Sequence, residues 1–362
     1  MNLNSPRFPP VTNLELEGDS SGEVLILACG FEPRSIAILK RYVEEERAPA
    51  GVVIIEYAPS DRRNKKKELR DLLRELQIPT GEQLWLCYHR FQPDSFEPLS
   101  HEMRRFLRNR RKLVLDISGM SRLLIALVLD ACNKFEGGMV IGYSEALVYH
   151  PTESAFKSNR KAVKKSSSAF VTGDVYEIVA ALPLSTVTMQ GHARVLIAFA
   201  TFNPRELVAL LNELSVQHLI LIEGKPHLEK DLWRLRATQD LNSRVDEVIA
   251  VAHLVASTFD YDETARILID AYSKYGETHK ILVAPIGSKL QTVAVFLSMQ
   301  VWPDVQIVYP VAKSFFTEYT EGVASIWQIK FDSYRQTIDQ MRRLRMASLD
   351  NLRKQIDQLS TD

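Results

Sequence analysis

The strongest constraint on the fold of this chain is an internal repeat. Residues 24–34 read VLILACGFEPR and residues 195–205 read VLIAFATFNPR, so six of eleven positions are identical at an offset of 171 residues. Further matched pairs follow at offsets of 166 to 168 residues: Ile55 and Ile222, Glu56 and Glu223, Lys112 and Lys280, Gly119 and Gly287, Tyr143 and Tyr309. Offsets that drift by a few residues at loops are expected of a duplicated domain. The sequence therefore predicts two copies of one unit.

Apolar runs alternate with amphipathic stretches in each copy. In the first copy the apolar runs lie at 24–28, 52–57, 84–88, 112–115 and 139–143. Continuous apolar strands that alternate with helices indicate a parallel sheet covered on both faces. We therefore expect an α/β protein of two tandem Rossmann-like units that form a pseudo-two-fold pair, followed by a C-terminal helix over 331–359.

These patterns divide the chain into five segments. We expect a poorly ordered lead-in over 1–22, a first unit over 23–150, a basic connector over 151–191, a second unit over 192–314 and a C-terminal helical segment over 315–362. The connector, which contains a strand or helix over 169–184, is either a solvated link or a phosphate-contacting loop above the first site. The C-terminal helix packs on the body or on a partner protein through an apolar stripe, namely Leu349, Leu352, Ile356 and Leu359.

The balanced overall charge excludes partners that would be attracted by a large net charge on the protein. Lys plus Arg and Asp plus Glu number 45 each, so neither duplex nucleic acid nor a membrane is expected as a partner, and phosphate recognition must be local. No leader pattern and no apolar run of about 18 residues is present, which favours a cytoplasmic protein. His101-Glu102 lacks the second histidine of a helical zinc motif, so neither a metal nor a cofactor is expected.

Two glycine turns follow matched strands. Residues 116–122 read DISGMSR and residues 284–290 read APIGSKL, and each sequence leads into an apolar helical pattern. Free N–H groups and the dipole at a helix N-terminus attract an anion. The ligand contacts expected here are Ser118, Gly119, Ser121, Arg122, Gly287, Ser288 and Lys289. The two serines at 121 and 288 also fit helix N-caps, a role that does not require the adjacent cation.

The turn after the first strand of each copy supplies further candidates. Ligands of open parallel sheets bind where the strand order reverses, beyond the carboxyl ends of the strands. The candidates there are Gly30, Phe31 and Arg34 in the first copy and Asn203 and Arg205 in the second. Each arginine would lie in the first turn of a helix, where it either faces an anion or packs its stem on the strand end in solvent. Gln291 either donates its amide to a base or ribose or lies exposed on its helix.

The two copies differ in their acidic residues. Glu32 and Asp116 occupy the first copy where Asn203 and Ala284 stand in the second. Any reaction would therefore use the first copy, with Glu32 or Asp116 as a general base or as the group that fixes a ribose hydroxyl. Alternatively, Asp116 only accepts a hydrogen bond from the turn that follows it.

A polar turn after strand 1 and a Gly287-Ser288-Lys289 turn that opens the helix after strand 4 resemble the CARF domain, and a chain with two such units resembles the SAVED arrangement of fused CARF domains. The resemblance covers 23–143 and 194–309, and 118–122 departs from it by one insertion and by Arg in place of Lys. It implies recognition of a cyclic oligonucleotide or related nucleotide signal in prokaryotic anti-phage defence. Because no effector domain is apparent, it also implies an effector protein as partner.

The sequence thus favours a sensor for a phosphorylated nucleotide. The amides of both glycine turns would hold the phosphates, together with four cations: Arg34, Arg122, Arg205 and Lys289. One alternative is a nucleotide-processing hydrolase or glycosidase that uses Glu32 and Asp116. A third interpretation is a scaffold whose crevices are vestigial.

Overall fold

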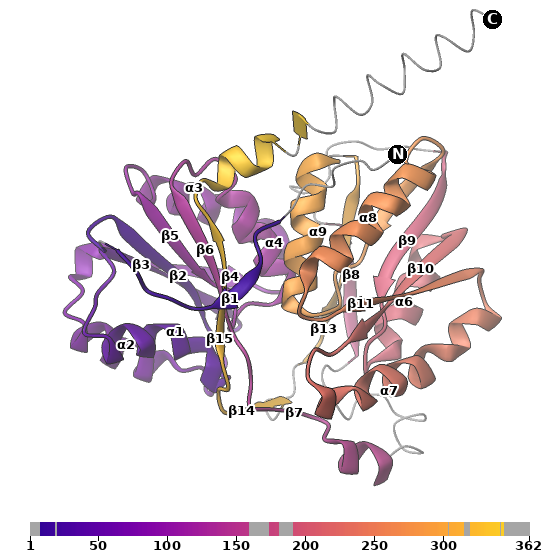
Figure 1. Ribbon diagram of the computed structural model, residues 1–362, viewed down its shortest axis with the longest axis horizontal. Coiled ribbons are helices and arrows are strands. Elements are labelled where there is room, and N and C mark those ends of the chain that lie inside the picture. Colours follow the sequence, from indigo (N-terminus) through magenta and orange to yellow (C-terminus); the bar gives the residue numbers. More distant parts are fainter. Residues whose placement is uncertain are drawn as a thin grey trace, which may run out of the picture.

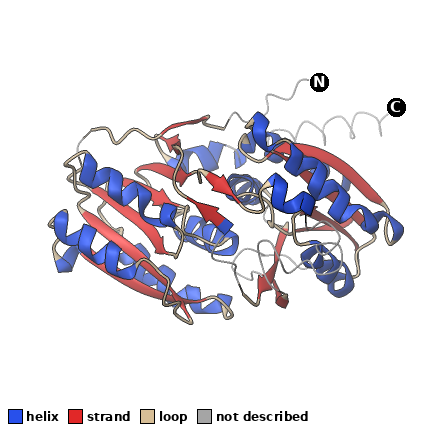
Figure 2. Ribbon diagram, turned by 90° about the horizontal axis from the view of Figure 1, so that it is seen from below, coloured by secondary structure: helices blue, strands red, loops and turns tan. Residues whose placement is uncertain are grey.

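Two mostly parallel sheets, of seven and six strands, lie side by side in the computed structural model (Figure 1). It describes residues 8–18, 20–158, 174–180, 191–302, 304–314, 319–340 and 342–343. Helices pack on the faces of both sheets (Figure 2). The prediction of two tandem Rossmann-like α/β units is confirmed. None of the helices in the described ranges is long and apolar enough to cross a bilayer.

The first unit contains five parallel strands in the order β4-β3-β2-β5-β6. They are β2 (Glu23–Cys29), β3 (Gly51–Ala58), β4 (Gln83–His89), β5 (Lys112–Asp116) and β6 (Gly138–Ser144). Every residue of β2 is buried, and each large aliphatic side chain there contributes about 1.5–3 kcal/mol. The helices are α1 (Ala37–Glu44), α2 (Lys66–Glu75), α3 (Phe96–Phe106) and α4 (Arg122–Ala131).

The second unit repeats this topology, with the strand order β11-β10-β9-β12-β13. Its strands are β9 (Ala193–Phe199), β10 (His218–Lys225), β11 (Val251–Ser257), β12 (His279–Val283) and β13 (Gln306–Ala312). Its helices are α6 (Pro204–Leu214), α7 (Trp233–Asn242), α8 (Tyr261–Tyr275) and α9 (Lys289–Val301). Short 3-10 turns complete the two units: η1 (Pro33–Ile36), η2 (Thr80–Glu82), η3 (Pro93–Ser95), η6 (Glu229–Asp231) and η7 (Ser243–Glu247).

The two units exchange strands. β8 (Val175–Ala180) follows the first unit but pairs antiparallel with β13, whereas β15 (Ile326–Phe331) follows the second unit and pairs antiparallel with β6. Between them, β7 (Val148–Tyr149) and β14 (Thr320–Glu321) pair with each other. The equivalent helices α4 and α9 are apolar on nearly all sides and pack together at the centre of the molecule (Figure 1). Equivalent elements thus contact each other, as expected of a pseudo-two-fold pair.

Two of the expected segment assignments differ from the structure. The lead-in over 1–22 contains β1 (Val11–Asn13), which pairs antiparallel with β15. The C-terminal segment contributes β15, so Phe331 ends a strand, and helix is described there over 334–340 and 342–343. β15 forms because the edge of β6 offers it hydrogen bonds, and β1 forms because β15 does the same in turn; local periodicity does not report such tertiary contacts. The apolar stripe at 349–359 and residues 159–173 of the basic connector lie outside the described residues.

Candidate ligand-binding site

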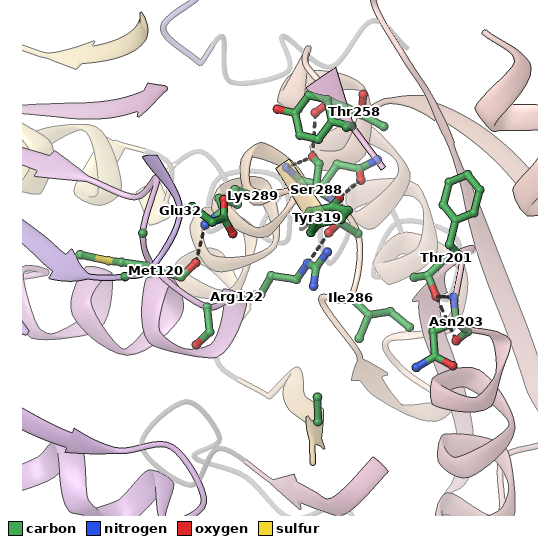
Figure 3. Close-up of a pocket in the computed structure, with 18 of the residues that line it drawn as sticks. Glu32, Met120, Arg122, Thr201, Asn203, Thr258, Ile286, Ser288, Lys289 and Tyr319 are labelled. Carbon is green, nitrogen blue, oxygen red and sulfur yellow. Dashed lines mark hydrogen bonds between the residues drawn. The ribbon is translucent and has the colours of Figure 1, made fainter. Parts of the chain in front are cut away.

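A cavity of about 420 Å³ lies between the two units, beyond the carboxyl ends of their strands. The turns that follow β2 and β5 line it from the first unit, and the turns that follow β9 and β12 line it from the second. Figure 3 shows Glu32, Arg122 and Lys289 around this space. The residues predicted from the sequence that line it are Gly30, Phe31, Glu32, Arg34, Gly119, Ser121, Arg122, Asn203, Gly287, Ser288, Lys289 and Gln291.

Three predicted site residues lie outside the cavity lining. Ser118 is fully buried, and its hydroxyl accepts a hydrogen bond from the amide of Ser144. Asp116 is buried beneath the turn that it precedes. Arg205 is about half exposed and forms an ion pair with Asp174. The local structure differs at the two arginines: Arg34 lies in the 3-10 turn η1 and is buried, whereas Arg205 lies in the first turn of the regular helix α6 and is half exposed.

Both serines of the glycine turns are N-caps. The hydroxyl of Ser121 accepts a hydrogen bond from the amide of Leu124, and the hydroxyl of Ser288 accepts one from the amide of Gln291. The Gln291 side chain in turn accepts a hydrogen bond from the Ser288 amide at 2.8 Å, which completes a capping box. Gln291 is only 1% exposed, so the interpretation of an exposed helix residue is wrong.

Several turn amides expected to bind phosphate are engaged by the protein itself. The Ser121 amide donates to the hydroxyl of Tyr57 at 2.8 Å, and this hydroxyl donates to the carbonyl oxygen of Gly119 at 3.2 Å. The Ser118 amide donates to Asp116, and the Ser288 amide is held by Gln291. Attraction for an anion therefore comes from the first turns of α4 and α9 and from cationic side chains rather than from a ring of turn amides.

The two cations that follow the N-caps cross the boundary between the units. The ammonium of Lys289 donates to the carbonyl oxygen of Met120 at 2.6 Å (Figure 3). It also donates to the carbonyl oxygens of Ser118, at 2.6 Å, and Ile117, at 3.1 Å. The guanidinium of Arg122 donates to the carbonyl oxygen of Gly287. Burial, reinforced by the nearby Arg34 charge, lowers the pKa of Lys289 to about 7. Matched residues thus tie each glycine turn to the other unit.

Arg34 is held by an ion pair within the cavity wall. It is 3% exposed, pairs with Glu32, and lies 3.4 Å from the hydroxyls of Tyr143 and Tyr149. Thr320 donates a further hydrogen bond to Glu32 at 3.1 Å. Burial opposes ionisation of Glu32, but the charges of Arg34 and Lys289 outweigh it and hold the pKa of this carboxyl below its ordinary value. Glu32 is therefore a paired, ionised carboxylate.

Asp116 lies in the protein interior and holds the turn that follows it. It is 1% exposed, and one carboxyl oxygen accepts the Ser118 amide at 2.8 Å, so the interpretation as a turn acceptor is correct. The other oxygen has no hydrogen-bond partner among the described residues, and burial raises the pKa of Asp116 to about 7. Because Asp116 does not line the cavity, it has no direct access to a ligand there.

Sequence reasoning missed the aromatic lining of the cavity. Rings from both units surround it: Tyr57, Tyr88, Tyr143, Tyr149, Phe199, Phe202, Phe259, Tyr309 and Tyr319. Three further arginines were also missed, namely Arg63, Arg90 and Arg234. Two matched aromatic pairs in the repeat, Phe31 with Phe202 and Tyr143 with Tyr309, were the signals that pointed to this lining. Aromatic faces next to cations suit stacking of nucleobases.

The fold and the cavity define a class of protein: two fused Rossmann-like units that share one ligand-sized pocket where both strand orders reverse. Within the part of the chain that the structure describes, no group of three or more His, Cys, Asp or Glu side chains could hold a metal ion. Neither a protein-family model nor a curated protein matches the sequence.

Three solved structures indicate what the fold is similar to. Can2 from Sulfobacillus thermosulfidooxidans, in complex with cyclic tetra-adenylate, is 13% identical over 32% of this chain and 31% of its own, with a TM-score of 0.26. A type III CRISPR defence DNA nuclease activated by cyclic oligoadenylate is 9% identical over 76% of this chain and 64% of its own, with a TM-score of 0.41. A universal stress protein from Archaeoglobus fulgidus is 11% identical over 80% of this chain and 96% of its own, with a TM-score of 0.22. This chain thus spans less than two thirds of the first two proteins, and all three likenesses are remote.

Proposed function

We propose that this protein is a sensor that binds a phosphorylated nucleotide in the cavity between its two units. The observation that carries the proposal is that the matched glycine turns, with the N-termini of α4 and α9, open into one cavity. Its volume of about 420 Å³ falls within the range of about 300–1,000 Å³ typical of small-molecule sites.

The charge of the cavity supports an anionic ligand. Arg122, Arg234 and Lys289 all donate to backbone carbonyl oxygens, and no described carboxylate forms an ion pair with them. A carbonyl oxygen satisfies a donor without neutralising its charge. A phosphate would therefore meet the guanidinium groups of Arg122 and Arg234, which have no ion-pair partner among the described residues, at two helix N-termini that also favour it, and its charge would in turn favour the protonated form of Lys289.

The reciprocal ties suggest how binding would be transmitted. A phosphate that attracts Arg122 or Lys289 competes with the hydrogen bonds from these cations to the opposite unit. Binding would then alter the contact between the units, and a partner protein would respond to the altered form. That this partner is an effector of anti-phage defence, and that the ligand is a cyclic oligonucleotide, rests on the resemblance to fused CARF domains.

Calorimetric titration of the full chain tests the proposal. The panel contains ATP, cyclic dinucleotides, cyclic tri- and tetra-adenylates and their linear forms. We expect saturable binding of at least one nucleotide, and a loss of about tenfold or more in affinity for Arg122→Gln because a charge-assisted contact is removed. Arg108→Gln, which changes an exposed arginine outside the cavity, is the matched control. Absence of binding, or equal losses in both variants, would refute the proposal.

The hydrolase or glycosidase alternative gains no support from the geometry. Glu32 is engaged by Arg34 and Thr320, and Asp116 lies outside the cavity. Neither carboxylate is therefore placed to activate a water beside a bound nucleotide.

A further inference from the structure

We infer that the ligand of this cavity lacks two-fold symmetry: its two halves differ chemically, as in a linear 5′-phosphorylated dinucleotide or a mixed-base ring. The inference rests on the proposed function and specifies its ligand class. It follows from residues that occupy equivalent positions in the two units but offer different chemistry to the same cavity.

The first difference lies at the turns after β2 and β9. Glu32 is an ionised carboxylate paired with Arg34, whereas the equivalent Asn203 is a neutral amide that is 2% exposed and also lines the cavity. Arg205, the counterpart of Arg34, points to solvent and pairs with Asp174. A ligand group that faces the carboxylate must donate hydrogen bonds, whereas a ligand group that faces the amide can either donate or accept them.

The second difference lies at the capped helices. Leu124 and Gln291 are equivalent, because the amide of each donates to the N-cap serine of its own helix. Gln291 lines the cavity, and its side-chain nitrogen has no hydrogen-bond partner among the described residues. Its oxygen is fixed by the Ser288 amide, so the unpaired end must be the donor. Leucine offers no such donor in the first unit.

The third difference is one of shape. Tyr57 stands at the end of β3, and its hydroxyl holds the Ser121 amide. The equivalent position after the matched Glu223 is Gly224, which has no side chain. One side of the cavity therefore presents a tyrosine ring where the other side has a glycine against which the Thr258 side chain packs.

A ligand with two-fold symmetry would present the same group to Glu32 and to Asn203, and the same surface to Tyr57 and to Gly224. One half of such a ligand would be mismatched at all three pairs of positions. Unpaired or repelling groups at buried sites weaken binding strongly, so a ligand with unlike halves is favoured.

Calorimetry with three dinucleotides tests this inference. The probes are cyclic di-AMP, which is symmetric, its linear form pApA, and the mixed ring cyclic AMP–GMP. We expect pApA or the mixed ring to bind at least about tenfold more tightly than cyclic di-AMP. Equal or tighter binding of cyclic di-AMP would overturn the inference while leaving nucleotide binding established. Failure of all three to bind, together with the rest of the nucleotide panel, would overturn both proposals.

Two variants make the halves more alike. Asn203→Asp places a carboxylate on both sides, and Gln291→Leu gives both helices a leucine at the same position. For a ligand with unlike halves, each variant should lose about tenfold or more in affinity and reduce the preference over cyclic di-AMP. Unchanged affinity in both variants, with thermal melting that shows each to be folded, would contradict the inference. If Gln291→Leu fails to fold because it loses the capping box, Asn203→Asp still tests the inference, since Asn203 is not part of that capping box.

Discussion

The ammonium of Lys289 lies 2.6 Å from the carbonyl oxygen of Met120, in the opposite unit of the chain. Lys289 stands where the first unit has Arg122, which makes the reciprocal contact with Gly287. The glycine turns are thus joined to each other by the same side chains that were expected to hold phosphate. Ligand binding and the contact between the units share one set of hydrogen-bond donors.

Replacement of Lys289 by methionine should therefore destabilise the protein in a pH-dependent manner. The variant leaves three buried carbonyl oxygens without their donor, a loss of about 1–3 kcal/mol. The folded pKa of Lys289 is about 7, below the unfolded value of 10.5, so the unfolded chain holds the proton between these values. The stability contributed by Lys289 consequently falls as the pH falls from about 10 to 7. In urea unfolding, Lys289→Met should therefore lower the free energy of unfolding more at pH 9 than at pH 6.

Lys40→Met is the control for this prediction, because Lys40 is exposed on α1. It should change the free energy of unfolding by no more than about 0.5 kcal/mol at either pH. A cost of Lys289→Met that is the same at pH 6 and pH 9 would contradict the assigned shift in pKa.

Asp116→Asn should flatten the stability profile between pH 4 and pH 7. The folded pKa of about 7 lies above the ordinary 3.8, so the folded protein holds a proton that the unfolded chain releases. The stability contributed by this group is present below about pH 4 and is lost as the pH rises to 7. Asparagine keeps an oxygen for the Ser118 amide and has no charge, so the variant should gain stability relative to wild type at pH 8. Urea midpoints at pH 5 and pH 8 measure this, with the exposed Asp270→Asn as control. Parallel profiles for wild type and Asp116→Asn would show the prediction to be wrong.

A methyl group at Gly287 should disrupt the second glycine turn. A Cβ atom there would lie 2.6 Å from the ring of Phe199 and would also clash with the Gln291 side chain of the capping box. We expect Gly287→Ala to lower the free energy of unfolding by about 1–3 kcal/mol, measured by urea denaturation. Gly81→Ala, where a Cβ atom meets nothing within 4 Å, should be close to neutral. Equal stability of both variants would exclude this close packing.

The N-cap serines should differ in their contributions to stability. Ser121→Ala loses one cap hydrogen bond and should cost about 1 kcal/mol. Ser288→Ala loses a cap within a capping box and also the hydrogen bond that the Ser288 hydroxyl donates to the carbonyl oxygen of Thr258 at 2.7 Å. It should therefore cost more than Ser121→Ala in thermal denaturation, whereas Ser273→Ala on the exposed face of α8 serves as reference. The reverse order of the two costs would contradict the geometry.

The sequence by itself determined the features that depend on local residue patterns or on the internal repeat, namely the two units, their parallel strands and the helix N-caps. Its offsets of 166 to 171 residues identified the two units, and its apolar runs located their parallel strands. The Ser121 and Ser288 caps were readable because an N-cap needs only its own helix. A shared strand order then placed most candidate residues beside one cavity, since the carboxyl ends of parallel strands meet at one edge.

Only the tertiary structure decided which partner each polar group finds. β1 and β15 are strands because another part of the chain supplies their hydrogen bonds, and the exchange of β8 and β15 joins elements far apart in sequence. Arg34 faces Glu32 while the matched Arg205 faces Asp174, although the local sequences are nearly alike. Lys289 and Arg122 reach across to the opposite unit for the same reason: their acceptors come from chain segments that only the fold brings within hydrogen-bonding distance.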